Sequence, residues 1–282
     1  MPLSDSALAS LVTSHDIIRL GVAADDERRR RHGRRTTFVR VADISASLGA
    51  PIDVPITAGE CRIVGVPPTR AAAFERVREV VTSGTTAPVS GFSLADLESL
   101  ALAEKVTLRS LLEELRAHGL ELIASAPFDK LRDARRSIEE VNIAGMRLAR
   151  LTIEQLPSAD PVALYKQIAE LQYEVGVVQA FAPLPRSVNP AVPTTGYDDV
   201  KRVALARVLL EAIPSIQVDW ALYGPKLAQV ALTVGADDLD AVSPLDDLSE
   251  GRRRAPLEEV RRNIEAAGFD PVERDGRFDQ RA

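Results

Sequence analysis

TLRSLLEELRAHGLELIASA, residues 107–126, is the stretch that shows most clearly how this chain folds. Leucines recur at helical spacing over 107–119, and Gly119 is of the residue type that commonly ends a helix. The segment 120–126 is short and apolar, as expected of a buried strand. A helix joined directly to a buried strand indicates an α/β protein.

The same alternation runs through almost the whole chain. Strands are predicted over 36–44, 61–66, 87–92, 120–126, 146–153, 177–184 and 215–221. Helices are predicted over 5–32, 70–84, 93–105, 107–119, 131–144, 161–176, 199–213 and 224–235. This order predicts an α/β fold, a complete or partial TIM-like (β/α) barrel of about six to seven parallel strands. Functional residues are then expected just after the carboxyl ends of the strands.

The length of 282 residues, 45% of them hydrophobic, suffices for one large domain. We expect an N-terminal helical segment over 1–35 and the barrel over 36–240. A charged C-terminal extension over 241–282, with one helix at 256–267, is expected to pack on the barrel. The extension is the least regular part of the chain, so its packing is predicted from its place and not from a pattern.

Composition argues against several classes of function. The 35 basic residues are outnumbered by 41 acidic ones, so no basic excess points to nucleic acid or to an anionic membrane. No apolar run reaches 18 residues, which predicts no transmembrane helix. The first residues, MPLSDSALASLVTSHD, lack the basic start and apolar core of a secretory signal, and a cytoplasmic location is expected.

Cys61 is the single cysteine, so the chain has no internal disulfide framework and no cysteine-based zinc site. Its position at the start of an apolar strand favours a buried structural thiol over a reactive one. The three histidines are scattered, and no metal site is predicted. The arginines from Arg28 to Arg35 indicate a solvated helix end, with an anion or partner site as the alternative.

Four stretches resemble the aminofutalosine synthase family. They are LQYEVGVVQAFAPL (171–184), PTTGYDDVKRVALARVLLEAIPSIQVDW (193–220), LYGPKLAQVALTVGADDLD (222–240) and EAAGFDPVERD (265–275). That family consists of radical SAM enzymes of the futalosine route to menaquinone, related to dehypoxanthine futalosine cyclase and the FO synthases. The resemblance covers most of residues 110–275 and is strongest from Leu171 onward. It implies a radical SAM type of barrel and a place in menaquinone biosynthesis.

The sequence departs from this family where the radical chemistry lies. The family holds a [4Fe–4S] cluster with a Cys-x3-Cys-x2-Cys motif after its first strand, and cluster irons need thiolate ligands. Here TFVRVADI (37–44) runs into SASLGAPIDVP (45–55) without a cysteine, and Cys61 falls in the family's second strand. The glycine-rich segment of the family is replaced by bulkier residues, 125–129. The comparison therefore implies a degenerate barrel with no cluster, and it puts SAM binding in doubt.

Candidate site residues follow from motif and position. Asp237 and Asp238 are adjacent carboxylates that either cap a turn or bind a ligand, and with Glu154 they are the acid–base candidates. Gln179 and Phe181 alternate toward one face and either contact a ligand or fill the barrel. Further ligand-binding candidates in loops and at strand–helix junctions are Asn189, Thr195, Asp198, Trp220, Lys226 and Gln229. Lys226 near a helix N-terminus hints at an anionic ligand or partner.

Three functional hypotheses result. The leading one is a cluster-free pseudoenzyme that has an accessory or ligand-binding role in the futalosine pathway. It would take a nucleoside-like small molecule and pair with a catalytic radical SAM relative or with itself, and it would bind neither nucleic acid nor membrane. The second is an enzyme that performs non-radical acid–base chemistry on a futalosine-like nucleoside. The third is a barrel whose family-like helix serves only as an oligomer interface.

Overall fold

Eight parallel strands close into a barrel in the computed structural model, which describes residues 16–155, 161–187, 194–246, 248 and 256–281. The strands are β1 (Arg35–Ser45), β2 (Glu60–Val64), β3 (Val89–Ser93), β4 (Leu122–Pro127), β6 (Leu151–Ile153), β7 (Ala180–Pro185), β8 (Ser215–Asp219) and β9 (Asp238–Val242). Pairing between β1 and β9 closes the barrel. The short strand β5 (Arg147–Leu148) also pairs with β4. The predicted TIM-like barrel is confirmed, and it is complete.

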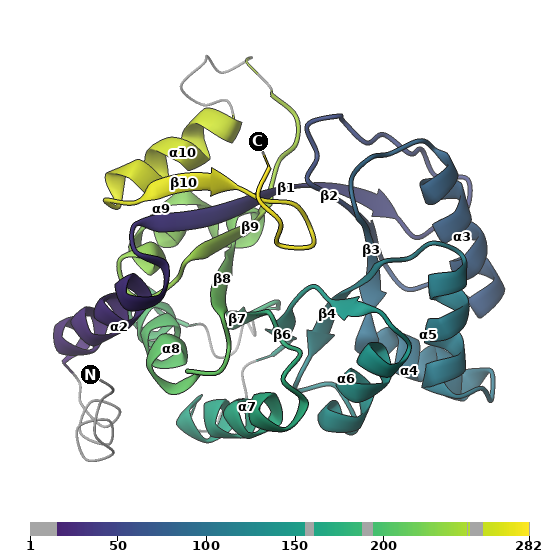
Figure 1. Ribbon diagram of the computed structural model, residues 1–282, viewed down its shortest axis with the longest axis horizontal. Coiled ribbons are helices and arrows are strands. Elements are labelled where there is room, and N and C mark those ends of the chain that lie inside the picture. Colours follow the sequence, from purple (N-terminus) through teal and green to yellow (C-terminus); the bar gives the residue numbers. More distant parts are fainter. Residues whose placement is uncertain (1–15, 156–160, 188–193, 247, 249–255, 282) are drawn as a thin grey trace.

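The described helices surround this barrel (Figure 1). They are α2 (Ile17–His32), α3 (Arg70–Thr82), α4 (Leu94–Ala103), α5 (Leu108–Ala117), α6 (Ala134–Ile143), α7 (Pro161–Val175), α8 (Gly196–Leu209), α9 (Trp220–Leu232) and α10 (Pro256–Ala266). Side-chain caps begin several of them: the Thr107 hydroxyl accepts from the Ser110 amide at 3.1 Å, and the Asp219 carboxylate from the Leu222 amide at 2.8 Å. No helix in the described ranges is long and apolar enough to cross a membrane.

Apolar side chains on the outer face of the strands form the core between barrel and helices. Phe38, Ile63, Ile123, Ile216 and Leu239 are fully buried there. The inner face is different in kind, because buried arginines, aspartates and a glutamate fill much of the barrel interior. Such charges are buried only where they are paired.

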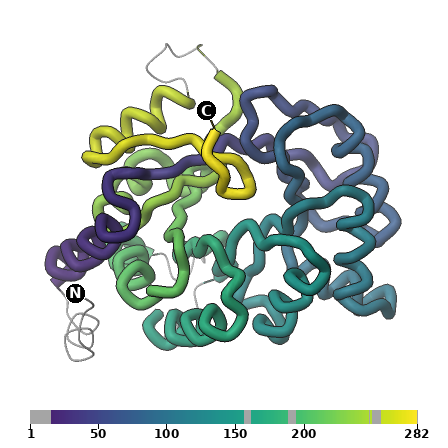
Figure 2. The backbone as a smooth tube through the Cα atoms, in the orientation of Figure 1, coloured from purple at the N-terminus to yellow at the C-terminus, as the bar shows by residue number. Residues whose placement is uncertain are grey.

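The C-terminal residues are joined to the start of the barrel. β10 (Asp270–Glu273) pairs in parallel with the first residues of β1. From Val41 onward, the same edge of β1 pairs with β2 instead. Figure 2 shows this end of the chain running alongside β1, and α10 packs against α9. The segment after β10 is anchored by the Gly276 amide, which donates to the Gly59 carbonyl at 3.0 Å.

Two strands were not expected from the sequence. Asp237 and Asp238 were expected to cap a turn or to bind a ligand after a helix, but Asp238 is the first residue of β9. β10, with its charged ends, was also missed. The seven predicted strands all occur, and the predicted helices occur wherever the structure describes their residues.

Arg28 on α2 differs from the expectation of a solvated helix end. It is fully buried, its Nε donates to the Ala236 carbonyl at 2.9 Å, and its guanidinium lies 3.5 Å from the centre of the Phe269 ring. Arg29 and Arg30 instead form ion pairs within the helix. Arg28 therefore fastens α2 to the barrel through backbone and aromatic contacts.

Candidate ligand site at the barrel mouth

A cavity of about 420 Å³ opens at the carboxyl ends of the barrel strands. Residues from or just after β1, β2, β3, β4, β7, β8 and β9 line it, together with Asp96 of α4 and residues at the start of α9. This is the end of a (β/α) barrel at which ligands are bound and chemistry is done. The lining is mixed, with three arginines, three aspartates and small or apolar side chains.

A buried charge cluster forms the floor of this cavity. The Arg62 guanidinium donates to both oxygens of Asp240, at 2.9 and 3.2 Å, and to Glu60 at 2.9 Å. Arg150 forms a further ion pair with Asp240, and the Ser90 hydroxyl donates to Glu60 at 2.6 Å. Burial alone would raise the pKa of Asp240, but the charges of Arg150 and Arg62 outweigh it and hold that pKa well below its usual range. The floor is thus a network of buried ion pairs.

Arg150 is the member of this cluster with hydrogen-bonding capacity left over. Only its Nη1 finds an acceptor among the described residues, the Asp240 carboxylate, although the side chain is almost fully buried. Burial, and next the charge of Arg62, lower its pKa, so a second anion near Arg150 would be electrostatically favoured. Because Arg150 lines the cavity, its remaining donors are available to a ligand.

Two carboxyl groups lie on the walls of the cavity. Asp43 lies near the carboxyl end of β1, and Asp96 lies in the first turn of α4. Withdrawal from bulk water raises the pKa of both groups, and the nearby Glu154 raises that of Asp96 further. Arg186 and Asp219 form an ion pair on the same rim. Carboxyl groups with raised pKa values in a cavity can exchange protons with a bound ligand.

Two of the four non-glycine residues that have positive φ angles in the described ranges lie at this mouth. Phe92 and Ala241 have positive φ angles of 61° and 58°, and both line the cavity. Side chains other than glycine are disfavoured in that conformation by roughly 1–2 kcal/mol. Strain of this kind is typical of functional sites.

The acid–base candidates lie in different places. Glu154 directly follows β6 beside the mouth, and its backbone amide donates to Asp129 at 2.7 Å. Asp238 lies at the opposite end of the barrel, bound by Arg274 at 2.6 Å through both oxygens and by the Thr37 hydroxyl. Asp237 is equally enclosed by Arg207, the Ser215 hydroxyl and the Ile216 amide. Only Glu154 of the three is near the cavity.

The ligand-binding candidates are not brought together. Phe181 is buried on the outer face of β7 and meets the Tyr165 ring edge-on at 5.7 Å. Gln179 precedes β7 at the amino end of the barrel. Thr195 and Asp198 form the capping box of α8, and Trp220 is buried at the start of α9. Lys226 and Gln229 lie further along α9, and Asn189 lies outside the described residues.

Sequence reasoning missed the residues that line the cavity: Asp43, Arg62, Asp96, Arg150 and Arg186. One signal was available, since Glu60 and Arg62 alternate within an otherwise apolar strand segment and so point to the same face. The other residues come from separate strands and one helix, and no sequence spacing connects them.

The residues at this mouth do not fit the iron–sulfur cluster that the family resemblance implies. Cluster ligation needs several thiolates near the end of β1. Cys61, the single cysteine of the sequence, is fully buried on the outer face of β2, away from Glu60 and Arg62. Burial raises the pKa of its thiol to about 12, so it stays protonated at neutral pH.

The fold and the position of this cavity define the class of protein, a closed (β/α) barrel with a polar cavity at the carboxyl ends of its strands. Methylornithine synthase (PylB) superposes with a TM-score of 0.66 at 15% identity, covering 96% of this chain and 95% of that one. The hydrogenase maturase HydG superposes with a TM-score of 0.64 at 10% identity, covering 96% and 72%. At such low identity these likenesses establish the fold alone.

Sequence comparison gives the nearer relationship. Residues 184–282 match the CofH/MqnC C-terminal region. Aminodeoxyfutalosine synthase of Thermus thermophilus is 25% identical over 221 residues, which is 67% of this chain and 59% of that protein. The 5-amino-6-(D-ribitylamino)uracil–L-tyrosine 4-hydroxyphenyl transferase of Archaeoglobus fulgidus is 38% identical over 121 residues, 38% of this chain and 35% of that protein. The chain is similar in sequence to these proteins, and it aligns with a third to three fifths of their length.

Proposed function

We propose that this protein is a cluster-free relative of the radical SAM futalosine enzymes that binds a nucleoside-like ligand in the barrel mouth. Its role in menaquinone biosynthesis would be accessory, beside a catalytic relative or as a homodimer. One observation carries the proposal: the mouth keeps a polar, strained cavity, while the only thiol of the sequence lies buried on the outer face of β2. The mouth therefore offers a cavity for a small molecule but no set of thiolates that could hold a cluster.

The chemistry of the cavity supports a ligand of this class. A volume of about 420 Å³ is within the usual range for small-molecule sites. Asp43 and Asp96 can accept hydrogen bonds from ribose hydroxyls, and the spare donors of Arg150 suit a carboxylate or a ring carbonyl. A hydroxylated nucleoside that carries an acidic or carbonyl group would use both sets.

The first test separates cluster chemistry from ligand binding. Anaerobic iron–sulfur reconstitution, followed by an iron count and a visible spectrum, should give no stoichiometric cluster. Stoichiometric iron with the absorption of a [4Fe–4S] centre would overturn the cluster-free proposal.

The second test measures binding directly. Aminodeoxyfutalosine and related nucleosides, added at about 100 times their dissociation constant, should stabilise the protein by about 2.7 kcal/mol and raise its melting temperature by several degrees. Asp96→Asn should weaken binding about tenfold because it removes one charged acceptor. Asp270→Asn is the matched control, since Asp270 is exposed on β10. Equal affinity of both variants, or no shift with any nucleoside, would count against the mouth as the site.

Acid–base catalysis is the second candidate function, and the raised pKa values of Asp43 and Asp96 favour it. These two groups, with Glu154 beside them, would act on a futalosine-like nucleoside, whereas Asp237 and Asp238 are held by structural ion pairs. Turnover of a candidate nucleoside should fall at least a hundredfold in Asp43→Asn or Asp96→Asn if either group transfers a proton. Undiminished turnover in both variants would exclude this mechanism.

A further inference from the structure

The amino end of the barrel, opposite the mouth, carries two further cavities. One has a volume of about 340 Å³ and the other of about 400 Å³, and they share Leu122, Arg147 and Arg277 as lining residues. Because three residues line both, the two cavities lie side by side, and together they are called the groove. It lies below the first residues of β4 and β5 and against the segment that follows β10.

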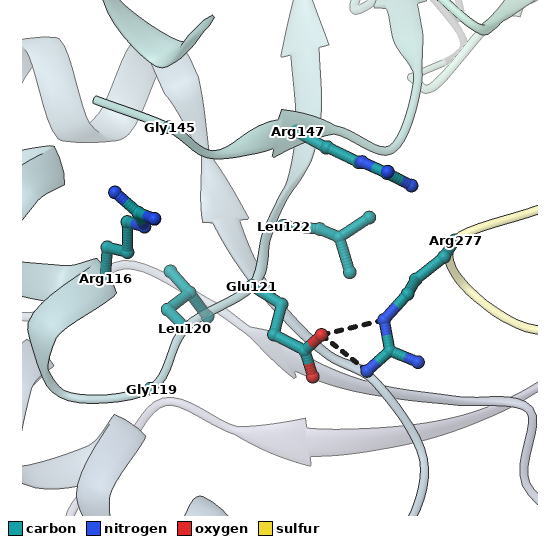
Figure 3. A pocket seen from close by; sticks show the side chains of 8 residues that line it. All are labelled: Arg116, Gly119, Leu120, Glu121, Leu122, Gly145, Arg147 and Arg277. Carbon is teal, nitrogen blue, oxygen red and sulfur yellow. Dashed lines mark hydrogen bonds and ion pairs between the residues drawn. The ribbon is translucent and has the colours of Figure 1, made fainter. Parts of the chain in front are cut away.

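Arginines dominate the first cavity. Arg116 stands on one side and Arg147 and Arg277 on the other, with Glu121 between them (Figure 3). Arg277 is neutralised, because its Nε and Nη2 donate to Glu121 at 2.8 and 2.5 Å. Arg116 donates only to the uncharged Ala144 carbonyl, at 3.2 Å, and Arg147 is exposed with no ion pair to any described residue. Two positive charges are therefore unmatched at one site.

Local backbone geometry places Arg116 against the opening of the cavity. Gly145 has a φ of 74°, and a Cβ atom there would lie 2.5 Å from the Arg116 Nη1. The glycine at this turn suits the positive φ and leaves room for the guanidinium to lie across the loop before β5. Three separate parts of the chain, α5, β5 and the segment after β10, bring their arginines to the same space.

The second cavity is of a different character. Its apolar lining consists of Leu122, Ile138, Val141, Met146, Leu148, Val177 and Phe278. The side-chain amides of Asn142 and Gln179 are the uncharged polar groups in it. A cationic cavity that adjoins an apolar one suits a ligand with an anionic head and an apolar or aromatic body.

We propose that this groove is a second ligand site, which binds a phosphomonoester carried on an aryl body. The phosphate would lie between Arg116 and Arg147, and the ring would occupy the apolar cavity beside Phe278. A phosphomonoester bears about −1.5 to −2 charges at neutral pH, which matches two unpaired guanidinium groups better than a single carboxylate does. Planar guanidinium groups also bind phosphate oxygens in pairs.

Isothermal titration of the full chain with phenyl phosphate at low salt tests the site. We expect saturable binding of one molecule, at least tenfold weaker in Arg147→Gln and weakened again by added salt. Arg135→Gln is the matched control, since it removes one exposed arginine from α6 outside the groove and should change the affinity less than twofold. The Arg147 side chain forms no hydrogen bond to a described residue, and its backbone pairing with β4 does not depend on the side chain, so we expect the substitution to leave the fold intact.

Two simpler probes divide the proposal into its parts. Inorganic phosphate should bind at least tenfold more weakly than phenyl phosphate, and phenol should not bind measurably. Equal affinity for phosphate and phenyl phosphate would refute the role of the apolar cavity. The absence of saturable phenyl phosphate binding, or binding that Arg147→Gln leaves unchanged, would overturn the site altogether. Neither result bears on the nucleoside proposal, which concerns the opposite end of the barrel.

Discussion

Asp240→Asn is the substitution that tests most directly how the barrel interior is held together. The Asp240 carboxylate is 1% exposed, and it accepts hydrogen bonds from Arg62 at 2.9 and 3.2 Å and from Arg150. An asparagine side chain has the same shape as the aspartate but no charge. Its amide NH2 group would face the N–H donors of the arginines. Arg150 then has no carboxylate partner among the described residues, and Arg62 keeps only Glu60.

The expected cost follows from that geometry. Removing one partner of a buried ion pair typically costs about 3–5 kcal/mol, because the other charge is left buried and unmatched. For a protein of this size each kcal/mol lowers the melting temperature by roughly 2–4 °C, so a fall of roughly 10 °C is expected. Urea denaturation followed by circular dichroism gives the free energy of unfolding. Asp270→Asn is the control, since its exposed pair with Arg34 should contribute about 0–1 kcal/mol.

The pH dependence provides a second measure of the same interaction. The pKa of Asp240 is depressed in the folded protein, so its contribution is fully present above the unfolded value of about 3.9. That contribution is lost as the pH falls from there toward the folded pKa. The difference in unfolding free energy between wild type and Asp240→Asn should therefore be constant from pH 7 to about pH 5 and shrink below about pH 4. A difference under about 1 kcal/mol at neutral pH, with an unchanged urea slope, would refute the reasoning.

Three further substitutions or probes test other parts of the structure. The Cys61 thiol should react with a chromogenic disulfide only after denaturant is added, because it is buried and protonated; rapid reaction of the native protein would place it elsewhere. Arg274→Ala should cost about 3–5 kcal/mol in urea denaturation, since it leaves Asp238 buried without its cation; a loss below 1 kcal/mol would mean that the neutral donors Thr37 and Gln217 suffice. Ala241→Gly should raise the melting temperature slightly, by relief of roughly 1 kcal/mol of backbone strain, and a lower melting temperature would show that the positive φ is not strained.

The two halves of the barrel interior differ in how completely their charges are paired. The amino half of the interior is closed by matched pairs such as Asp238 with Arg274, where every carboxylate oxygen has a donor. Toward the mouth the matching is incomplete, since Arg150 keeps unused donors and the pKa values of Asp43 and Asp96 are raised. A ligand that enters the mouth meets groups whose hydrogen bonds are not yet made, which is the condition for binding with specificity.

Much of the fold could be predicted because local signals and tertiary packing agree. Leucines at helical spacing over 107–119, a threonine cap at Thr107 and a glycine stop at Gly119 determine a helix without help from the rest of the chain. Apolar strands between such helices lead to a parallel barrel, because only helices on the outside can cover their outer face. The sequence also states by itself that no set of thiolates is present, since it holds one cysteine.

What only the tertiary structure decided is the charged interior. Asp238 and Asp240 lie in a strand that was not predicted from the sequence, because carboxylates rarely enter strands. Their cations, Arg274, Arg62 and Arg150, lie 36, 178 and 90 positions away along the chain. Burial of a charge is stable only when its partner is already in place, so β9, the floor of the mouth and the cavity above it exist only once the barrel has closed.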